Sequence, residues 1–171
     1  MKIMVVYQSK TGFTQKYATW IAQALSCEAK ELNRVSSAEI ESYDTVIFGG
    51  WIMGGNISGL NKIRSMNPKQ LIVFAVGSSP DCEAKRNQLK TQNALAETPF
   101  FYFQGGLCFE KLGFFSKMMV KMANNAVRKK ENKTEQEEEL VKLFDAGSYD
   151  RSDIGAIEPL VAFVKGEEYE N

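Results

Sequence analysis

Continuous apolar runs alternate with amphipathic segments along most of this chain. Apolar runs rich in β-branched and aromatic residues predict buried strands, and apolar residues three or four positions apart predict helices. The strands are predicted over 2–7, 29–32, 44–50, 70–76 and 99–106. The helices are predicted over 14–25, 60–66, 81–95 and up to residue 165, with a short turn at the capping-box sequence 36–39. Asp81 is predicted to cap the third of these helices, and Ser152 or Asp153 the last.

Strands that alternate with helices at this spacing predict an α/β fold. We expect a doubly wound, five-stranded parallel sheet with helices on both faces, in three layers. In such sheets, ligands bind beyond the carboxyl ends of the strands. Three loops rich in glycine, serine, threonine or asparagine follow strands at that edge: 9–14, 51–59 and 77–81. These loops are the predicted binding site.

The composition is that of one globular domain. The chain has 171 residues, of which 44% are hydrophobic, and its 21 basic residues balance its 21 acidic ones. This balance does not favour a nucleic-acid partner. No apolar run approaches the roughly 20 residues needed to span a bilayer. The apolar run at the N-terminus is too short for a secretory signal, so we expect a cytoplasmic protein.

Cysteine and histidine usage excludes several kinds of chemistry. The three cysteines are widely spaced without a CxxC pair, which argues against a disulfide framework, a structural zinc site and a thioredoxin-type motif. The chain has no histidine, which excludes a Ser-His-Asp triad, a Cys-His dyad and a histidine-ligated metal. We expect no metal site, and any redox chemistry must come from a cofactor.

The first loop has the composition of an anion-binding turn. It reads SKTGFT and joins a buried strand to an amphipathic helix. Successive backbone N–H groups and the positive end of the helix would face one point, with hydroxyl groups of Ser9, Thr11 and Thr14 as further donors. The simpler alternative is that Thr11 or Thr14 only caps the helix. The loop sequence matches neither the Walker (P-loop) motif nor the GxGxxG motif.

At this point the chain resembles the flavodoxin-like superfamily. SKTGFT is similar to the flavodoxin signature [ST]-x-T-G-x-T, which wraps the phosphate of FMN, and Met53-Gly54-Gly55 resembles the tight turn that flavodoxins place against the flavin ring. The resemblance covers roughly the first 106 residues and implies a sheet order of 2-1-3-4-5. It implies that Met53 or Trp51 lies near the flavin, and that the Gly54–Gly55 peptide rotates to bond the reduced ring.

The predicted cofactor is therefore FMN. Its predicted binding residues are Ser9, Lys10, Thr11, Gly12, Phe13, Thr14, Trp51, Ile52, Met53, Gly54, Gly55, Asn56, Gly77, Ser78 and Ser79. One departure from the family concerns the third loop, which in ordinary flavodoxins carries an aromatic residue that stacks on the outer flavin face. Here the loop reads GSSPD. The flavin face is then open or covered by another element. No catalytic residue is identified.

A basic, methionine-rich helix is predicted over 111–130. It would contact an anionic membrane, a partner or a flat apolar ligand, or simply pack on the sheet. Its apolar stripe consists of Leu112, Phe114, Phe115, Met118, Met119, Met122, Ala126 and Val127. The charged run that follows, 128–140, is predicted to be a solvated loop and the start of a helix.

The position of this basic helix resembles the menaquinone-dependent protoporphyrinogen IX dehydrogenase branch of the superfamily. That branch also lacks the aromatic residue in the third loop and has an insertion here. The resemblance implies one flavodoxin-like domain over 1–171, with an inserted helical segment at about 107–150. It also implies peripheral contact with the inner face of a membrane through 111–130.

Three functions follow from these patterns. The first is an FMN-binding electron carrier or oxidoreductase with a redox partner protein. The second is an FMN enzyme that oxidises a porphyrinogen or another small flat substrate and passes electrons to a quinone. The third is a cofactor-free interaction module of the same fold, which would have no need of an intact SKTGFT loop.

Overall fold

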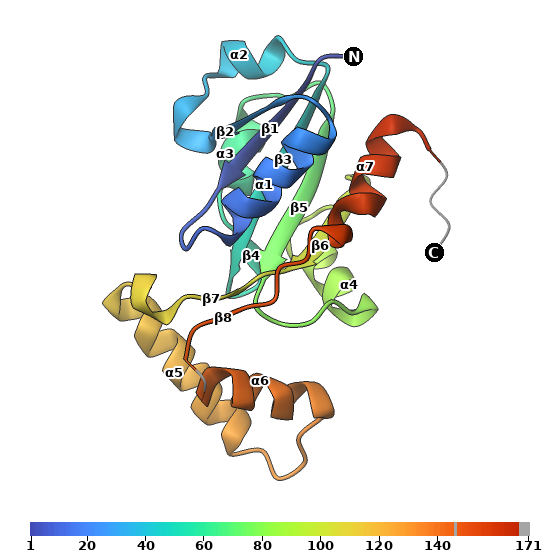
Figure 1. Ribbon diagram of the computed structural model, residues 1–171. Helices are drawn as coiled ribbons and strands as arrows, with labels where there is room; N and C mark the ends of the chain where they lie inside the picture. Colours follow the sequence, from blue (N-terminus) through green and yellow to red (C-terminus); the bar gives the residue numbers. More distant parts are fainter. Residues whose placement is uncertain (146, 168–171) are drawn as a thin grey trace.

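Five parallel strands form the centre of the computed structural model, which describes residues 1–145 and 147–167 (Figure 1). The predicted domain over 1–171 thus extends over residues that lie outside this description. The strands are β1 (Ile3–Gln8), β2 (Glu28–Glu31), β3 (Thr45–Met53), β5 (Leu71–Gly77) and β6 (Phe100–Gln104). They pair in the order β2-β1-β3-β5-β6, which confirms the predicted order 2-1-3-4-5.

Alternate strand residues point to opposite faces of the sheet, and each face has its own apolar core. On one face, Met4 and Val6 pack with residues of α2 (Ser37–Glu41), α3 (Leu60–Ser65) and α4 (Glu83–Gln92). On the other, Val5 packs with α1 (Phe13–Ala24) and α7 (Glu158–Lys165). The three predicted layers are therefore confirmed.

Two short antiparallel pairings were not predicted. β4 (Asn56–Ile57) pairs with the end of β3, so the strand predicted to end at residue 50 continues to Met53. β7 (Gly106–Leu107) pairs with β8 (Tyr149–Asp150), which brings together two segments more than 40 residues apart in the chain. Two-residue strands have too little sequence periodicity to be recognised.

The predicted helix caps are right in one case and wrong in two. Ser36 caps α2 by accepting a hydrogen bond from the Glu39 N–H at 3.3 Å. The N-cap of α4 is Cys82, and the Asp81 carboxylate pairs with Arg86. Neither Ser152 nor Asp153 caps α7, whose N-cap is Ile157 after a 3₁₀ turn, η3 (Gly155–Ile157).

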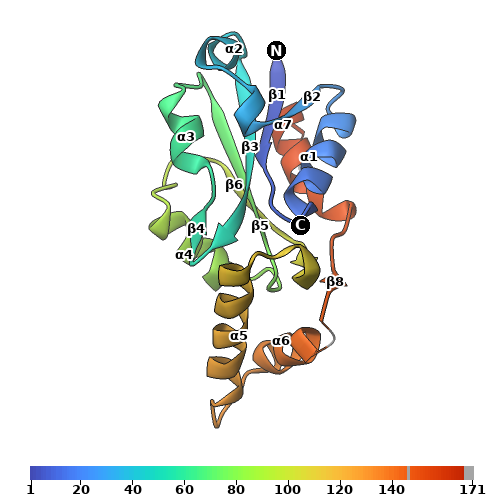
Figure 2. The ribbon, with the colours of Figure 1, turned by 90° about the vertical axis from the view of Figure 1, so that its left-hand side faces the viewer.

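Two helices project beyond the carboxyl edge of the sheet (Figures 1 and 2). They are α5 (Phe114–Arg128), which follows the 3₁₀ turn η2 (Phe109–Lys111), and α6 (Glu135–Asp145). Four residues of the predicted stripe are exposed on α5: Phe114 (80%), Met118 (40%), Met119 (56%) and Met122 (60%). The interpretation that this stripe packs on the sheet is therefore wrong for these four residues. The side chain of Phe115, in the same stripe, lies outside the described residues.

α6 begins with a capping box, formed by a threonine and a glutamate three residues apart in the sequence. The Thr134 hydroxyl accepts from the Glu137 N–H at 3.2 Å, and the Glu137 carboxylate accepts from the Thr134 N–H at 3.1 Å. The predicted helix start within the charged run is thus confirmed. Within the described ranges, no helix has the length and apolarity needed to cross a membrane.

Candidate functional site

A cleft of about 380 Å³ lies where the three predicted loops meet. Ten of the predicted residues line it, drawn from all three loops: Lys10, Thr11, Phe13, Thr14, Trp51, Ile52, Met53, Gly54, Gly77 and Ser78. The other five, Ser9, Gly12, Gly55, Asn56 and Ser79, belong to the same loops without lining the cleft. The parallel sheet brings the loops together because it places the carboxyl ends of β1, β3 and β5 side by side.

The first loop ends at Gly12, which is the N-cap of α1. Its φ of +103° lies in the left-handed region, where a glycine avoids the strain that a Cβ would cause. The Gly12 N–H donates to the Ser9 hydroxyl at 3.1 Å, which closes the turn. No side chain among the described residues caps α1, and Thr14 is buried. The alternative in which Thr11 or Thr14 caps this helix is therefore wrong.

An uncapped helix start is suited to an anion. The first N–H groups of a helix have no intrahelical acceptor and carry partial positive charge. The first turn of α1 contains no acidic residue, and Lys10 and Thr11 line the cleft beside it. A phosphate group placed there would meet backbone donors, a hydroxyl and a cation.

The second loop is a tight hairpin turn between β3 and β4. Its two central residues, Gly54 and Gly55, have φ of +57° and +82°, the signs of a type I′ turn. The end of α4 holds both of their carbonyl groups. The side-chain amide of Gln92 donates to the Gly54 oxygen at 2.9 Å, and that of Asn93 donates to the Gly55 oxygen at 2.8 Å. These two hydrogen bonds from the end of α4 fix the turn. They could not be predicted from the sequence of the loop itself.

Lys10 and Trp51 join the first two loops across the cleft. The Lys10 ammonium group lies 5.1 Å from the centroid of the Trp51 ring, within the range of a cation–π contact. Met53, at the end of β3, is 55% exposed and lines the same cleft. Trp51, Met53 and Lys10 thus give this part of the cleft an aromatic ring, a flexible thioether and a positive charge.

The third loop is held by tyrosines rather than lined by an aromatic residue of its own. Tyr102 donates to the Ser79 carbonyl oxygen at 2.6 Å, and Tyr149 donates to the Ser78 carbonyl oxygen at 3.3 Å. Burial raises the pKa of Tyr102 to about 12, although the hydrogen bond with Ser79 acts in the opposite direction. Burial also raises the pKa of Tyr149. Both phenols therefore remain neutral donors at physiological pH.

The sequence did not predict the wall that faces these loops. It comes from β7, the segment after it and one side of α5, and consists of Gly106, Leu107, Cys108, Leu112, Met119, Val120 and Ala123. Most of these residues are apolar. The sequence predicted an apolar stripe over 111–130. It did not predict that part of this stripe lines the cleft. The third loop has no aromatic residue of its own, and this apolar wall completes the lining of the cleft.

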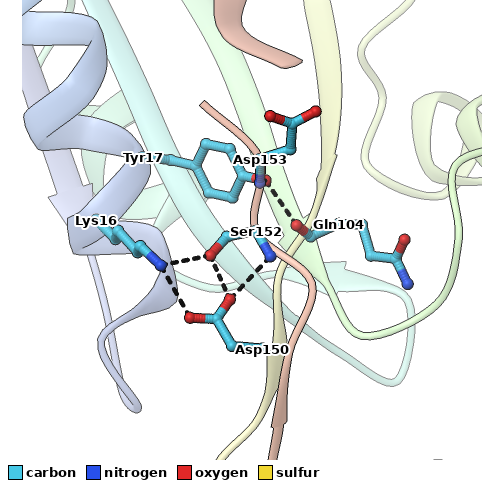
Figure 3. A network of polar contacts seen from close by, with 6 residues as sticks. All are labelled: Lys16, Tyr17, Gln104, Asp150, Ser152 and Asp153. Carbon is cyan, nitrogen blue, oxygen red and sulfur yellow. Dashed lines mark hydrogen bonds and ion pairs between the residues drawn. The ribbon is translucent and has the colours of Figure 1, made fainter. Parts of the chain in front are cut away.

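A polar network holds residues 150–153, at the end of β8 and directly after it, against α1 (Figure 3). The Lys16 ammonium group lies 2.8 Å from both the Asp150 carboxylate and the Ser152 hydroxyl. Tyr17 accepts from the Asp153 N–H at 3.0 Å and donates to the Gln104 carbonyl oxygen at 2.6 Å. Since β8 pairs with β7, this network also fixes the cleft wall at the end where α1 begins.

The described side chains offer no group of three or more cysteine, aspartate or glutamate residues that could hold a metal ion. The donors that converge on the cleft are backbone amides, hydroxyl groups and lysine, and its walls are apolar and aromatic. This set suits a ligand with an anionic end and a flat apolar body.

Comparison with solved structures returns flavodoxins with low identity. A flavodoxin from the domain Archaea is 15% identical, with a TM-score of 0.42 over 59% of this chain and 78% of that one. Oxidised flavodoxin 2 from Bacillus cereus is 21% identical, with a TM-score of 0.42 over 60% of this chain and 84% of that one. Two-electron reduced flavodoxin from Megasphaera elsdenii is 17% identical, with a TM-score of 0.42 over 58% of this chain and 82% of that one.

Comparison at the level of sequence gives a family. No curated protein matches this chain. The flavodoxin domain family, in contrast, matches residues 4–135, which is well over half of the chain and includes all three loops and α5. This chain therefore belongs to the flavodoxin domain family.

Proposed function

We propose that this protein binds FMN in the cleft and serves in electron transfer. One observation carries the proposal: ten residues from three loops far apart in sequence line a single cleft at the uncapped start of α1. FMN, when bound, supplies one- or two-electron chemistry, and the protein supplies binding, orientation and electrostatics.

Different residues of the cleft would bind the phosphate group, contact the ring and exclude water, according to their chemistry. The first-turn amides of α1, with Lys10 and Thr11, would hold the phosphate group. Trp51, Met53 and the Gly54 turn would contact the flat ring. Leu112, Met119 and Val120 on the opposite wall would keep water from it. The resemblance also implies that the Gly54–Gly55 peptide rotates, and the hydrogen bond from Gln92 would oppose that movement.

The absorption spectrum of the purified protein tests this proposal directly. A protein that carries FMN should absorb in the visible range and release FMN on denaturation. If it is purified colourless, titration with FMN should quench the fluorescence of the flavin with saturation at one site. A colourless protein that takes up no FMN would reject the proposal in favour of the cofactor-free interaction module.

A second candidate function is the oxidation of a flat apolar substrate, such as a porphyrinogen, with a quinone as acceptor. Two observations favour it: the third loop has no aromatic residue of its own, and the apolar wall from α5 would offer a flat apolar substrate a surface to contact beside the ring. Anaerobic turnover of protoporphyrinogen with menaquinone distinguishes this enzyme from a carrier. Reduction of the bound flavin by the substrate, followed by reoxidation with the quinone, would support the enzyme. Contact of 111–130 with a membrane stays a prediction.

A further inference from the structure

The Gly54–Gly55 turn adopts one of two orientations that its sequence allows. Type I′ and type II′ turns both join two strands through two residues, and they differ by a rotation of the central peptide through roughly half a turn. Type I′ has a positive φ at both central residues, and type II′ only at the first. Glycine at both positions permits either type, and the φ values of +57° and +82° are those of type I′. Contacts outside the turn therefore decide its orientation.

The end of α4 supplies those contacts. Gln92 donates to the Gly54 carbonyl oxygen at 2.9 Å, a hydrogen bond that the observed orientation permits. The Gln92 carboxamide also packs on the turn, since a Cβ at Gly55 would lie 2.2 Å from Gln92 Oε1. Asn93 holds the Gly55 carbonyl, which belongs to the following peptide. Rotation of the Gly54–Gly55 peptide would therefore break the hydrogen bond from Gln92 and leave that from Asn93 in place.

The orientation of this peptide determines which of its groups meets a ligand. C=O and N–H point in opposite directions in a trans peptide. The Gly54 carbonyl faces Gln92, which does not line the cleft, whereas Gly54 itself does. The Gly55 N–H is therefore the group on the cleft side, and after rotation the Gly54 carbonyl would take its place. The turn offers a donor as Gln92 holds it, and would offer an acceptor when rotated.

We propose that Gln92 is a positioning residue that lowers the reduction potential of FMN bound in the cleft. The inference rests on the proposed function, in which the flat ring lies against the Gly54 turn. Nitrogen N5 of the oxidised ring is a hydrogen-bond acceptor, and two-electron reduction with uptake of one proton turns it into an N–H donor. A turn that offers the Gly55 N–H suits the oxidised ring and opposes the reduced one. The reduced ring needs the rotated turn, without the hydrogen bond from Gln92.

A binding cycle gives the sign of this effect. The turn accepts oxidised FMN as it stands, so the Gln92 hydrogen bond is present before and after binding. The turn accepts reduced FMN only when that hydrogen bond is broken, which weakens the binding. Removal of the Gln92 side chain should therefore leave the affinity for oxidised FMN unchanged and raise the affinity for reduced FMN. Tighter binding of the reduced form raises the reduction potential.

Gly54 allows the turn to be locked without a change at Gln92. The first central position of a type II′ turn is reserved for glycine, whereas a type I′ turn accepts asparagine there, as in the common Asn-Gly turn. A Cβ at Gly54 would meet no atom within 4 Å, so Gly54→Asn has the space it needs. The peptide of this variant keeps the type I′ orientation whichever residue stands at position 92. In this background, Gln92→Ala should have no effect on the potential.

Two measurements on the full chain test the inference: the Kd of oxidised FMN by fluorescence quenching, and the two-electron potential of bound FMN by anaerobic dithionite titration against a reference dye. Gln92→Ala should keep the Kd and bind reduced FMN about fivefold more tightly. A fivefold change raises the potential by about 20 mV for a two-electron couple. Gln88→Ala is the matched control, because Gln88 is exposed on α4 one turn before Gln92. The control should change neither quantity.

The combined variants decide between positioning and a direct effect of the Gln92 side chain. Gly54→Asn should lower the potential, and Gln92→Ala added to it should cause no further change. An equal rise in both backgrounds overturns the inference, as does a Gln92→Ala potential that is unchanged or lowered. Each of these results comes from protein that binds FMN, so the proposed function would stand. A protein that takes up no FMN rejects both. If Gly54→Asn alone binds no FMN, Gln92→Met replaces it and should match Gln92→Ala; a potential like that of the unmodified protein overturns the inference.

Discussion

The Gln92 side-chain amide donates a hydrogen bond to the Gly54 carbonyl oxygen at 2.9 Å, across 38 positions of sequence. The next residue, Asn93, holds the other carbonyl of the turn and accepts from the buried Ile57 N–H at 2.9 Å. Because C=O and N–H point in opposite directions in a trans peptide, the Gly55 N–H points away from Gln92. Two consecutive residues of another element thus set the orientation of the turn in the cleft wall.

Asn93 should contribute far more to stability than Gln92. Asn93→Ala leaves the Ile57 N–H and the Gly55 carbonyl without their partner, and unsatisfied buried groups cost about 1–3 kcal/mol each. We expect its free energy of unfolding to fall by about 2–4 kcal/mol in urea denaturation. Gln92→Ala, which removes an exposed hydrogen bond, should cost at most about 1 kcal/mol. Equal losses in the two variants would contradict this assignment.

Gly12 should resist replacement although there is space for a side chain. A Cβ there would meet no atom within 4 Å, but the φ of +103° is unfavourable for any residue with a Cβ. We expect Gly12→Ala to lower the free energy of unfolding by about 1–2 kcal/mol. Gly113→Ala is the matched control, since Gly113 is also a helix N-cap in open space but has a φ of −68°. Gly113→Ala should lower stability less than Gly12→Ala, because both variants replace a glycine N-cap but only the change at Gly12 adds backbone strain.

Thr11 tests the position of the phosphate group in the proposed function. Thr11→Val removes the hydroxyl group and keeps the branched shape. Loss of one hydrogen bond to an anion should weaken FMN binding by roughly 1.5–3 kcal/mol, which is about tenfold or more in Kd. Riboflavin lacks the phosphate, so its affinity, measured in parallel by fluorescence quenching, should not change. An equal loss for both ligands would place the phosphate away from Thr11.

Tyr102 should make stability fall at high pH. Its pKa is about 12 in the folded protein, against 10.0 as its ordinary value, so the unfolded chain loses this proton first. The stabilisation is complete below pH 10 and is lost as the pH rises to about 12. Over this window the free energy of unfolding should fall by up to about 2–3 kcal/mol from this group.

The Tyr102→Phe variant isolates that contribution. The variant loses the hydrogen bond to the Ser79 carbonyl oxygen and should be less stable at neutral pH. Its stability should decline less than that of the unmodified protein between pH 10 and about 12, as measured by urea denaturation at each pH. Parallel declines in the two proteins would assign the effect to other groups.

The sequence alone determined the sheet and the edge at which the cleft lies. Buried strands such as 44–50 and 70–76 are continuous apolar runs, and their alternation with helices allows few arrangements. SKTGFT and the two other loops then had to meet, because parallel neighbouring strands end at the same edge. Patterns within a few residues were sufficient for these conclusions.

Only the tertiary structure decided what surrounds the loops. A helical stripe shows that a face is apolar, but not what it contacts, so it was not predictable that Met119 lines the cleft and its neighbour Met118 does not. The same holds for Gln92, whose polar side chain finds the Gly54 carbonyl only in the folded chain. Local pattern determines the element that a segment forms, whereas its contacts depend on residues brought close by the whole fold.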